Sequence, residues 1–151
     1  MCPLGKAVSS LCYLVFLLTT VFAISISMVL LSFKGCSNIS TLTFPDGLTS
    51  IGRNAFYACS SITSITIPKS VLSIGRNAFY ANSSATSLTI SNGVTSIGET
   101  AFYRCSSIMS IVIPESVAHI GSSAFYGCTS ATLLSIPAGM QSIGDHVFRG
   151  Q

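Results

Sequence analysis

The chain has 151 residues, and only 7% of them are charged, against roughly 25% in an ordinary soluble domain. The seven Lys and Arg residues give a net charge of +3 and are scattered along the chain, so no basic patch of the kind that binds nucleic acid is expected. Four acidic residues and two histidines are too few and too dispersed for a catalytic cluster, and the six cysteines include no Cys-x-x-Cys pair, so no enzyme, cofactor or metal site is predicted.

The first element is a hydrophobic segment, residues 11–33, which contains no charged residue, no glycine and no proline. As a helix, a segment of this length would measure about 35 Å, enough to cross the roughly 30 Å hydrocarbon core of a bilayer. Lys6 precedes the segment and Lys34 follows it. We therefore expect an uncleaved signal-anchor helix in a first region, residues 1–35, and a single-pass protein at the membrane or cell surface.

Cleavage of this segment as a signal peptide is the main alternative. A cut after Ala23, with Val21 at the minus-three position, is possible, and the protein would then be secreted. It would leave an apolar stretch on the mature end, and a signal-peptide core is typically about 7–15 residues long. A wrongly assigned start or a buried helix is the remaining interpretation. The few flanking charges indicate the membrane orientation only weakly.

A 23-residue repeat organises the second region, residues 36–151. Ile-Gly recurs at this spacing, and Ala-Phe begins three residues after each glycine, with Val147 in place of Ala in the last copy. A fixed period of this length is typical of an architecture in which copies stack and bury a shared core. The copies span residues 36–58, 59–81, 82–104, 105–127 and 128–150.

Each repeat is predicted to begin with a short strand. In residues 62–68, Ile65 and Ile67 alternate with Ser64 and Thr66, which is the period-2 pattern of a strand with one buried face. A proline ends this strand in four of the five copies, because proline cannot donate to the hydrogen-bond ladder.

A second extended run, residues 71–74, is expected to point Val71 and Ile74 inward. The glycine after it, Gly75 in this copy, suits either a positive φ or a closely packed corner. Stacked copies would place equivalent side chains in columns. One column is predicted to contain Phe56, Phe79, Phe102, Phe125 and Phe148, and another Ile51, Ile74, Ile97, Ile120 and Ile143.

Cysteine occupies one shared position of four repeats, and Asn82 stands there in the remaining copy. A small residue buried at a solenoid turn fits this pattern, which favours thiols over disulfides. Because stacked strands are about 4.8 Å apart, a bridge between neighbouring copies is the alternative. The pairs concerned are Cys36 with Cys59 and Cys105 with Cys128.

The repeated phrase L/I-x-x-I-x-I-P-x-x-V-x-x-I-G-x-x-A-F-x-x-C resembles the BspA-like subtype of leucine-rich repeats. The resemblance covers residues 36–151 and implies a mainly β leucine-rich-repeat solenoid with a parallel sheet. With the five 23-residue copies and the hydrophobic segment, the expected fold is a solenoid of five coils preceded by one N-terminal hydrophobic helix. It also implies a surface or secreted protein used in adhesion and protein recognition, whose partner is a protein, an extracellular-matrix component or a glycan. Ser91 for proline, Ala85 and Ala131 for Ile, and Val147 for Ala depart from the pattern without breaking the register.

The outward side of the first strand is the candidate partner-binding surface. A flat parallel sheet would align its side chains in two rows, and hydroxyl groups can hold a partner by many weak hydrogen bonds. Serine and threonine are equally suited to a solvated β surface without a binding role, so that interpretation stays open. The residues are Thr41, Thr43, Ser64, Thr66, Ser87, Thr89, Ser110, Val112, Leu133 and Ser135.

Asn38 and Asn82 each begin an Asn-x-Ser glycosylation sequence. Asn82 lies in the inward cysteine position, so Asn38 is the predicted acceptor. A tyrosine follows the phenylalanine in four copies and is expected to cover the turn with its hydroxyl in water. The alternative to a recognition module is a fragment of a larger repeat protein with only a structural role, because Arg149-Gly-Gln151 is too short to cap the last coil.

Overall fold

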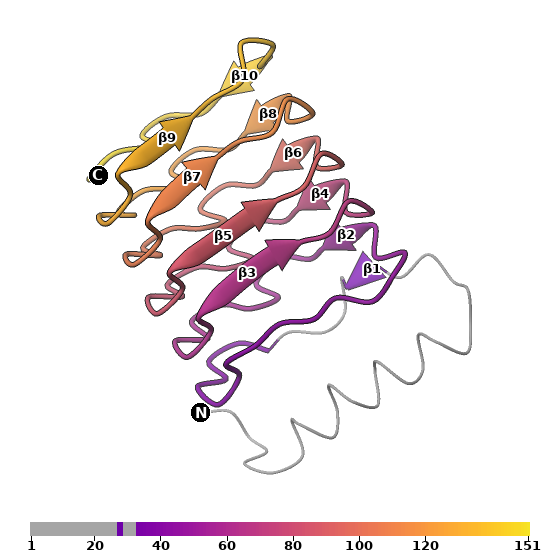
Figure 1. Cartoon of the computed structure of the whole chain (residues 1–151), viewed down its shortest axis with the longest axis vertical. Coiled ribbons are helices and arrows are strands. Elements are labelled where there is room, and N and C mark those ends of the chain that lie inside the picture. The colour runs from indigo at the N-terminus through magenta and orange to yellow at the C-terminus, as the bar shows by residue number, and fades with distance from the viewer. Residues whose placement is uncertain (1–26, 29–32) are drawn as a thin grey trace.

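In the computed structural model, which describes residues 27–28 and 33–151, the chain winds into a mainly β solenoid (Figure 1). Two rows of short strands climb the stack from the N-terminal to the C-terminal end, and turns join them. The strands are β1 (Ser27–Met28), β2 (Ser50–Ile51), β3 (Ser64–Ile67), β4 (Ser73–Ile74), β5 (Ser87–Ile90), β6 (Ser96–Ile97), β7 (Ser110–Val112), β8 (His119–Ile120), β9 (Leu133–Ser135) and β10 (Ser142–Ile143).

The pairing of these strands turns the 23-residue period into one coil of the solenoid. One row is a six-stranded parallel sheet in the order β1-β2-β4-β6-β8-β10, and its register joins equivalent repeat positions, such as Ser50 with Ser73. In the other row β3 pairs with β5 and β7 pairs with β9, again in parallel. The Met109 N–H donates to the Thr86 carbonyl over 3.2 Å and continues this second row between the two pairs.

The alternation predicted for the first strand is confirmed in β3. Ile65 and Ile67 are fully buried, whereas Ser64 and Thr66 are exposed. Val71, which follows the turn at Pro68, is buried as well. The apolar positions of each repeat therefore face one shared core, as the pattern requires.

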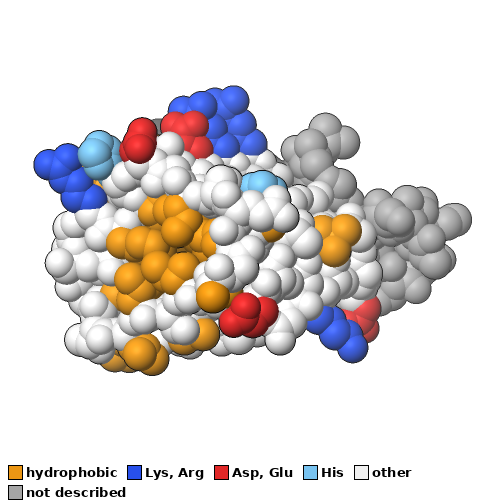
Figure 2. All heavy atoms as spheres, turned by 90° about the horizontal axis from the view of Figure 1, so that it is seen from above, with side chains coloured by type: hydrophobic (Ala, Val, Ile, Leu, Met, Phe, Trp, Pro, Cys, Tyr) orange, Lys and Arg blue, Asp and Glu red, His pale blue; other side chains and the backbone are white. Residues whose placement is uncertain are grey.

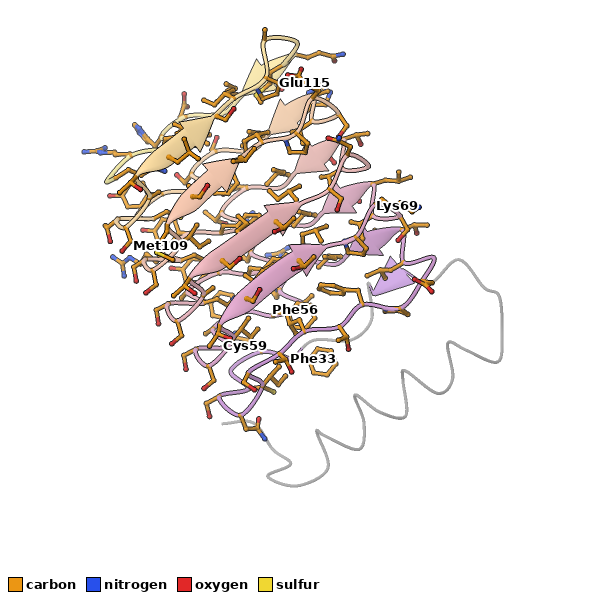
Figure 3. The ribbon with its side chains drawn as sticks, viewed as in Figure 1. Phe33, Phe56, Cys59, Lys69, Met109 and Glu115 are labelled. Carbon is orange, nitrogen blue, oxygen red and sulfur yellow. The ribbon has the colours of Figure 1, made fainter. Side chains whose placement is uncertain are left out.

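The two predicted columns of core side chains are also confirmed. Phe79 stacks on Phe56 with 5.3 Å between ring centroids and on Phe102 with the same separation. Figure 3 shows the lower part of this column, with Phe33 and Phe56 inside the coils. The columns become exposed only at the C-terminal end, where Ile143 is 48% exposed and Phe148 half-buried.

Within the hydrophobic segment 11–33, over which the sequence predicts a helix, the structure describes only Ser27–Met28 and Phe33. Ser27–Met28 is strand β1, paired in parallel with Ser50–Ile51. Phe33 is buried and stacks on Phe56 at 5.4 Å. Both segments lie one 23-residue period before their partners, so repeat packing begins before Cys36. The rest of the expected helix lies outside the described residues.

Residues 27–28 and 33–151 include no helix with the length and apolar character needed to span a bilayer.

The glycine after the second strand is required by close packing of successive coils. A Cβ on Gly98 would lie 2.7 Å from the backbone N of Arg76, and one on Gly121 would lie 2.4 Å from that of Glu99. Positive φ occurs a few residues later, for example at Asn54 (58°). The sequence left two roles open for these glycines, a positive φ or a closely packed corner. The structure shows the closely packed corner.

The shared cysteine position forms a buried column of hydrogen-bond donors. Four of its five side chains donate to the backbone carbonyl of a phenylalanine 26 residues earlier. The bonds are Cys59 Sγ to Phe33 O (3.0 Å), Asn82 Nδ2 to Phe56 O (2.8 Å), Cys105 Sγ to Phe79 O (3.1 Å) and Cys128 Sγ to Phe102 O (3.4 Å). Asn82 can replace cysteine because its amide supplies the same donor.

Asn82 offers a direct test of this column. Its Oδ1 is buried and has no hydrogen-bond partner in the described part of the chain. Asn82→Ala removes the donor to the Phe56 carbonyl and should lower the free energy of unfolding by about 1–3 kcal/mol. Asn82→Cys restores a donor and removes the unpaired oxygen, so its unfolding free energy in urea should match or exceed that of the wild type. Equal losses for both variants would contradict the donor role.

Burial also makes the stability of the chain sensitive to alkaline pH. Burial raises the pKa of the Cys128 thiol from 9.0 to about 12. The pKa of the Cys105 thiol is raised further, first by its burial and second by the charge of the neighbouring Cys128. Unfolded thiols ionise near pH 9 and folded ones near pH 12 or above, so this stabilisation is complete below pH 9 and is lost as the pH rises.

We expect the free energy of unfolding to fall between pH 9 and pH 12 by about 1 kcal/mol per pH unit for each thiol. Urea denaturation of the wild type and of Cys128→Ala across this range measures the difference. Tyrosine ionisation is common to both proteins, so a shallower decline in the variant isolates the thiol. Parallel pH profiles would contradict the assignment.

Candidate recognition surface

The outward side of the first strand row forms one continuous surface, which we call the outer strand face. Register aligns its members across coils: Ser64 pairs with Ser87 and Thr66 with Thr89, and a bridge joins Thr41 to Ser64. All ten residues predicted for this face point outward, and each is exposed except the half-buried Ser110. The face comprises Thr41, Thr43, Ser64, Thr66, Ser87, Thr89, Ser110, Val112, Leu133 and Ser135.

The chemistry of the outer strand face changes along the stack. Hydroxyl groups occupy it as far as β5, and large apolar side chains then appear on β7 and β9. Val112 is 49% exposed and Leu133 54% exposed. Exposed apolar side chains that occur singly are ordinary, but neighbours on a paired sheet form a patch that water solvates poorly. This end of the face is therefore the part best suited to contact a partner.

Met109 is a further exposed apolar residue at this end of the stack, and the alternation pattern of the strand did not predict it. It precedes β7 and is 57% exposed, at the edge of the stack in Figure 3. The equivalent residue is serine in the first coil and threonine in the three others. The Thr86 and Thr132 hydroxyls each donate to the carbonyl one coil earlier. Methionine cannot make this bond. A comparison of repeat positions would have revealed the replacement of threonine by methionine.

Four tyrosines form a second ladder beside the phenylalanine column. Their rings stack with centroid separations of 4.6, 4.9 and 5.0 Å from Tyr57 through Tyr80 and Tyr103 to Tyr126. Each ring is half-buried. Burial and the two neighbouring tyrosines raise the pKa of Tyr80. The rings thus cover the turns, as predicted, and their faces are occupied by one another.

The titratable residues are not gathered into a reactive cluster in the described part of the chain. Glu115 lies in a turn at the edge of the stack (Figure 3). His119 is in β8, where its Nδ1 lies 2.8 Å from the Ser142 hydroxyl. Asp145 and His146 are exposed on the last coil. Within residues 27–28 and 33–151, no group of three or more His, Cys, Asp or Glu could hold a metal ion.

The two glycosylation sequences differ in exposure. Asn82 is fully buried and Asn38 is exposed. An oligosaccharide could not be attached to Asn82 without opening the coil, whereas Asn38 leaves room for one. Asn38 stays the predicted acceptor, and peptide mapping after expression in a glycosylating cell would test it.

These features define a leucine-rich-repeat solenoid, and the family of the chain follows from a direct comparison. The chain belongs to the BspA-type leucine-rich repeat family: the family model, "BspA type Leucine rich repeat region (6 copies)", matches residues 30–151. The resemblance seen in the sequence is thereby confirmed. The match begins upstream of Cys36, in agreement with the buried position of Phe33. Comparison with curated protein sequences finds no significant match.

Three solved structures share the fold. The leucine-rich repeat protein TpLRR from T. pallidum is 33% identical, with a TM-score of 0.66, and the match covers 70% of this chain and 50% of that one. A leucine-rich repeat protein from Bacteroides ovatus ATCC 8483 is 29% identical, with a TM-score of 0.61 and coverage of 75% and 35%. A leucine rich cell surface protein from Faecalibacterium prausnitzii A2-165 is 34% identical, with a TM-score of 0.61 and coverage of 73% and 31%.

The matched region thus spans half or less of the length of each of these solved chains.

Proposed function

We propose that the chain is a non-enzymatic recognition and adhesion module that binds a protein partner through the outer strand face. The observation that carries this proposal is the exposure of Val112, Leu133 and Met109 beside aligned hydroxyl groups on paired strands. A surface of this kind combines apolar contacts, which supply binding free energy, with hydroxyl groups that fix orientation. The parallel ladder beneath holds the side chains in place before the partner arrives, which lowers the entropic cost of binding.

The proposed location is the membrane or the cell surface. The part of the hydrophobic segment that precedes β1 would direct the chain to export, where it would stay as an anchor or be cleaved, and residues 36–151 would carry the recognition surface. The similar protein from F. prausnitzii is described as a cell surface protein. External protease added to intact cells that express a C-terminally tagged chain should remove the tag, and complete protection would contradict a surface location.

A pair of substitutions tests the binding role of the outer strand face. Val112→Ser with Leu133→Ser restores the hydroxyl pattern of the other coils and should leave the fold intact, because both side chains point into water. Leu72→Ser is the matched control, since Leu72 is 53% exposed but precedes β4 in the other strand row.

The wild type and both variants are compared on immobilised extracellular-matrix proteins and, separately, on immobilised glycans. We expect the double variant to lose at least about tenfold in affinity for the protein targets, while the control retains binding. A protein target bound equally by all three chains would contradict the assigned face. Binding confined to glycans would contradict a protein partner.

A further inference from the structure

The turn that follows each corner glycine carries most of the positive charge of the described residues. It spans residues 53–58 in the first coil and the equivalent residues of the later coils. The 23-residue winding brings basic residues that are far apart in the sequence to this one side of the solenoid. In Figure 2 the basic side chains stand at the rim of the molecule, away from the hydrophobic patch at its centre. Of the six described Lys and Arg residues, five lie in this turn or one period before it: Lys34, Arg53, Arg76, Arg104 and Arg149.

The tyrosine ladder lies in the same turn and holds two of these cations in place. The Lys34 Nζ lies 4.9 Å from the centroid of the Tyr57 ring, which occupies the equivalent position one period later. The Arg104 guanidinium carbon lies 5.5 Å from the centroid of Tyr103. Arg149 stands in the tyrosine position of the last coil. At about 4.8 Å per coil, the backbone positions of Lys34 and Arg149 are about 24 Å apart along the stack.

Carboxylates neutralise only part of this charge. Glu99 and Asp145 are the two acidic residues of the turn. Glu99 pairs with Arg76 at 3.2 Å, which is the one ion pair among the described residues. Lys34 and Arg104 are exposed. Both cations are therefore available to the anionic groups of a ligand.

The packing of the tyrosine rings limits the kind of polyanion that fits. Single-stranded nucleic acid binds by stacking its bases on free aromatic faces. Successive rings of the ladder are only 4.6, 4.9 and 5.0 Å apart, so no base can insert between them. A membrane surface requires apolar side chains that enter the lipid, and none of the large exposed apolar side chains of the described residues lies in this turn.

The ladder instead offers a row of ring edges with one hydroxyl group per coil. A tyrosine hydroxyl both donates and accepts hydrogen bonds, as the hydroxyl groups of a sugar do. A polymer that combines sugar hydroxyls with regularly placed anionic groups matches both features of this side of the solenoid. The four tyrosines with Lys34, Arg104 and Arg149 form what we call the tyrosine ridge.

We propose that the tyrosine ridge binds a linear acidic polysaccharide, which lies along the axis of the stack. Carboxylate or sulfate groups of the polymer pair with Lys34, Arg104 and Arg149, and its hydroxyl groups bond to the tyrosine hydroxyls between them. The contacts of Lys34 and Arg104 with aromatic rings hold these cations in position before the ligand arrives. The ridge shares no residue with the outer strand face. The proposal is therefore independent of the recognition role, and Val112→Ser with Leu133→Ser should leave polysaccharide binding unchanged.

Binding of the full chain to polygalacturonate, a linear carboxylated polysaccharide, tests the proposal by isothermal titration calorimetry. We expect binding at low ionic strength that weakens as salt is added, and no binding of the methyl ester, which is the same polymer without its charge. Arg104→Gln should lower the affinity at least about threefold. Lys69→Gln is the matched control, because it removes the same charge from an exposed turn after β3 and should retain the wild-type affinity.

Tyr80→Phe tests the hydroxyl row separately. It keeps the stacked ring and removes one hydroxyl, so the affinity for polygalacturonate should fall about threefold. Absence of binding to polygalacturonate, equal binding of the methyl ester, or equal losses in Arg104→Gln and Lys69→Gln would overturn the proposal. Tighter binding of poly-glutamate or of single-stranded oligothymidine than of polygalacturonate would overturn it as well, because the occupant would then be an acidic peptide or a nucleic acid.

Discussion

Replacement of Phe102 by alanine is expected to cost about 3–5 kcal/mol of unfolding free energy. Phe102 is fully buried and lies between Phe79 and Phe125, with ring centroids 5.3 and 5.1 Å away. The substitution removes its contacts on both sides and opens a cavity in the middle of the column. A native domain is stable by only about 5–15 kcal/mol, so the variant should be close to unfolding. Urea denaturation followed by circular dichroism measures the loss.

Phe148 provides the matched control. It is the equivalent residue of the last coil, is half-buried, and stacks on Phe125 alone among the described residues, at 5.8 Å. Phe148→Ala should therefore cost about half as much as Phe102→Ala. Similar losses at the two positions would show that stacking on both sides does not determine the stability of the column.

Replacement of Gly121 by alanine should cost about 3 kcal/mol although it adds a single methyl group. The new Cβ would lie 2.4 Å from the N and 2.8 Å from the Cα of Glu99 in the preceding coil. Both atoms are backbone, so no side chain can rotate away, and the two coils must separate locally. The separation would also lengthen the hydrogen bond from the Gly121 N–H to the Ile97 carbonyl, which measures 2.8 Å.

Gly139→Ala is the control for this effect. No atom lies within 4 Å of the position that its Cβ would occupy, and its φ is not positive. The change in unfolding free energy should stay within about 0.5 kcal/mol of zero. A Gly121→Ala variant as stable as Gly139→Ala would contradict the close approach of successive coils.

The buried core could be predicted from the sequence because the apolar residues that alternate within each strand are also the ones that recur every 23 residues. Ile65 and Ile67 alternate with hydroxyl residues, and their equivalents recur every 23 residues, so a single buried face satisfies both patterns. The hydrophobic segment before Cys36 is open to two interpretations for a physical reason. An apolar run without charges fits a membrane helix as well as buried repeat positions, and only the spacing from Phe33 to Phe56 favours the latter.

The alternation of apolar and hydroxyl residues also predicted which side chains of the first strand point outward. Which of these side chains lie next to one another on the surface could be seen only in the structure. A strand pattern identifies which side chains point away from the core but not which neighbours they join across coils. Val112 and Leu133 share one surface because β7 pairs with β9, and that pairing is visible only in the structure. The donor role of Asn82 was equally inaccessible, because the Phe56 carbonyl that it meets is 26 residues away in sequence.

Exchange of individual phenylalanine amides tests the stacked-coil arrangement most directly. The N–H groups of Phe56, Phe79 and Phe102 each donate to a carbonyl of the following coil, over 2.7, 2.8 and 2.7 Å. The account predicts that these three amides belong to the slowest-exchanging set and open only with global unfolding of the chain. Exchange of the three as fast as that of the exposed turn at Gly139 would contradict it.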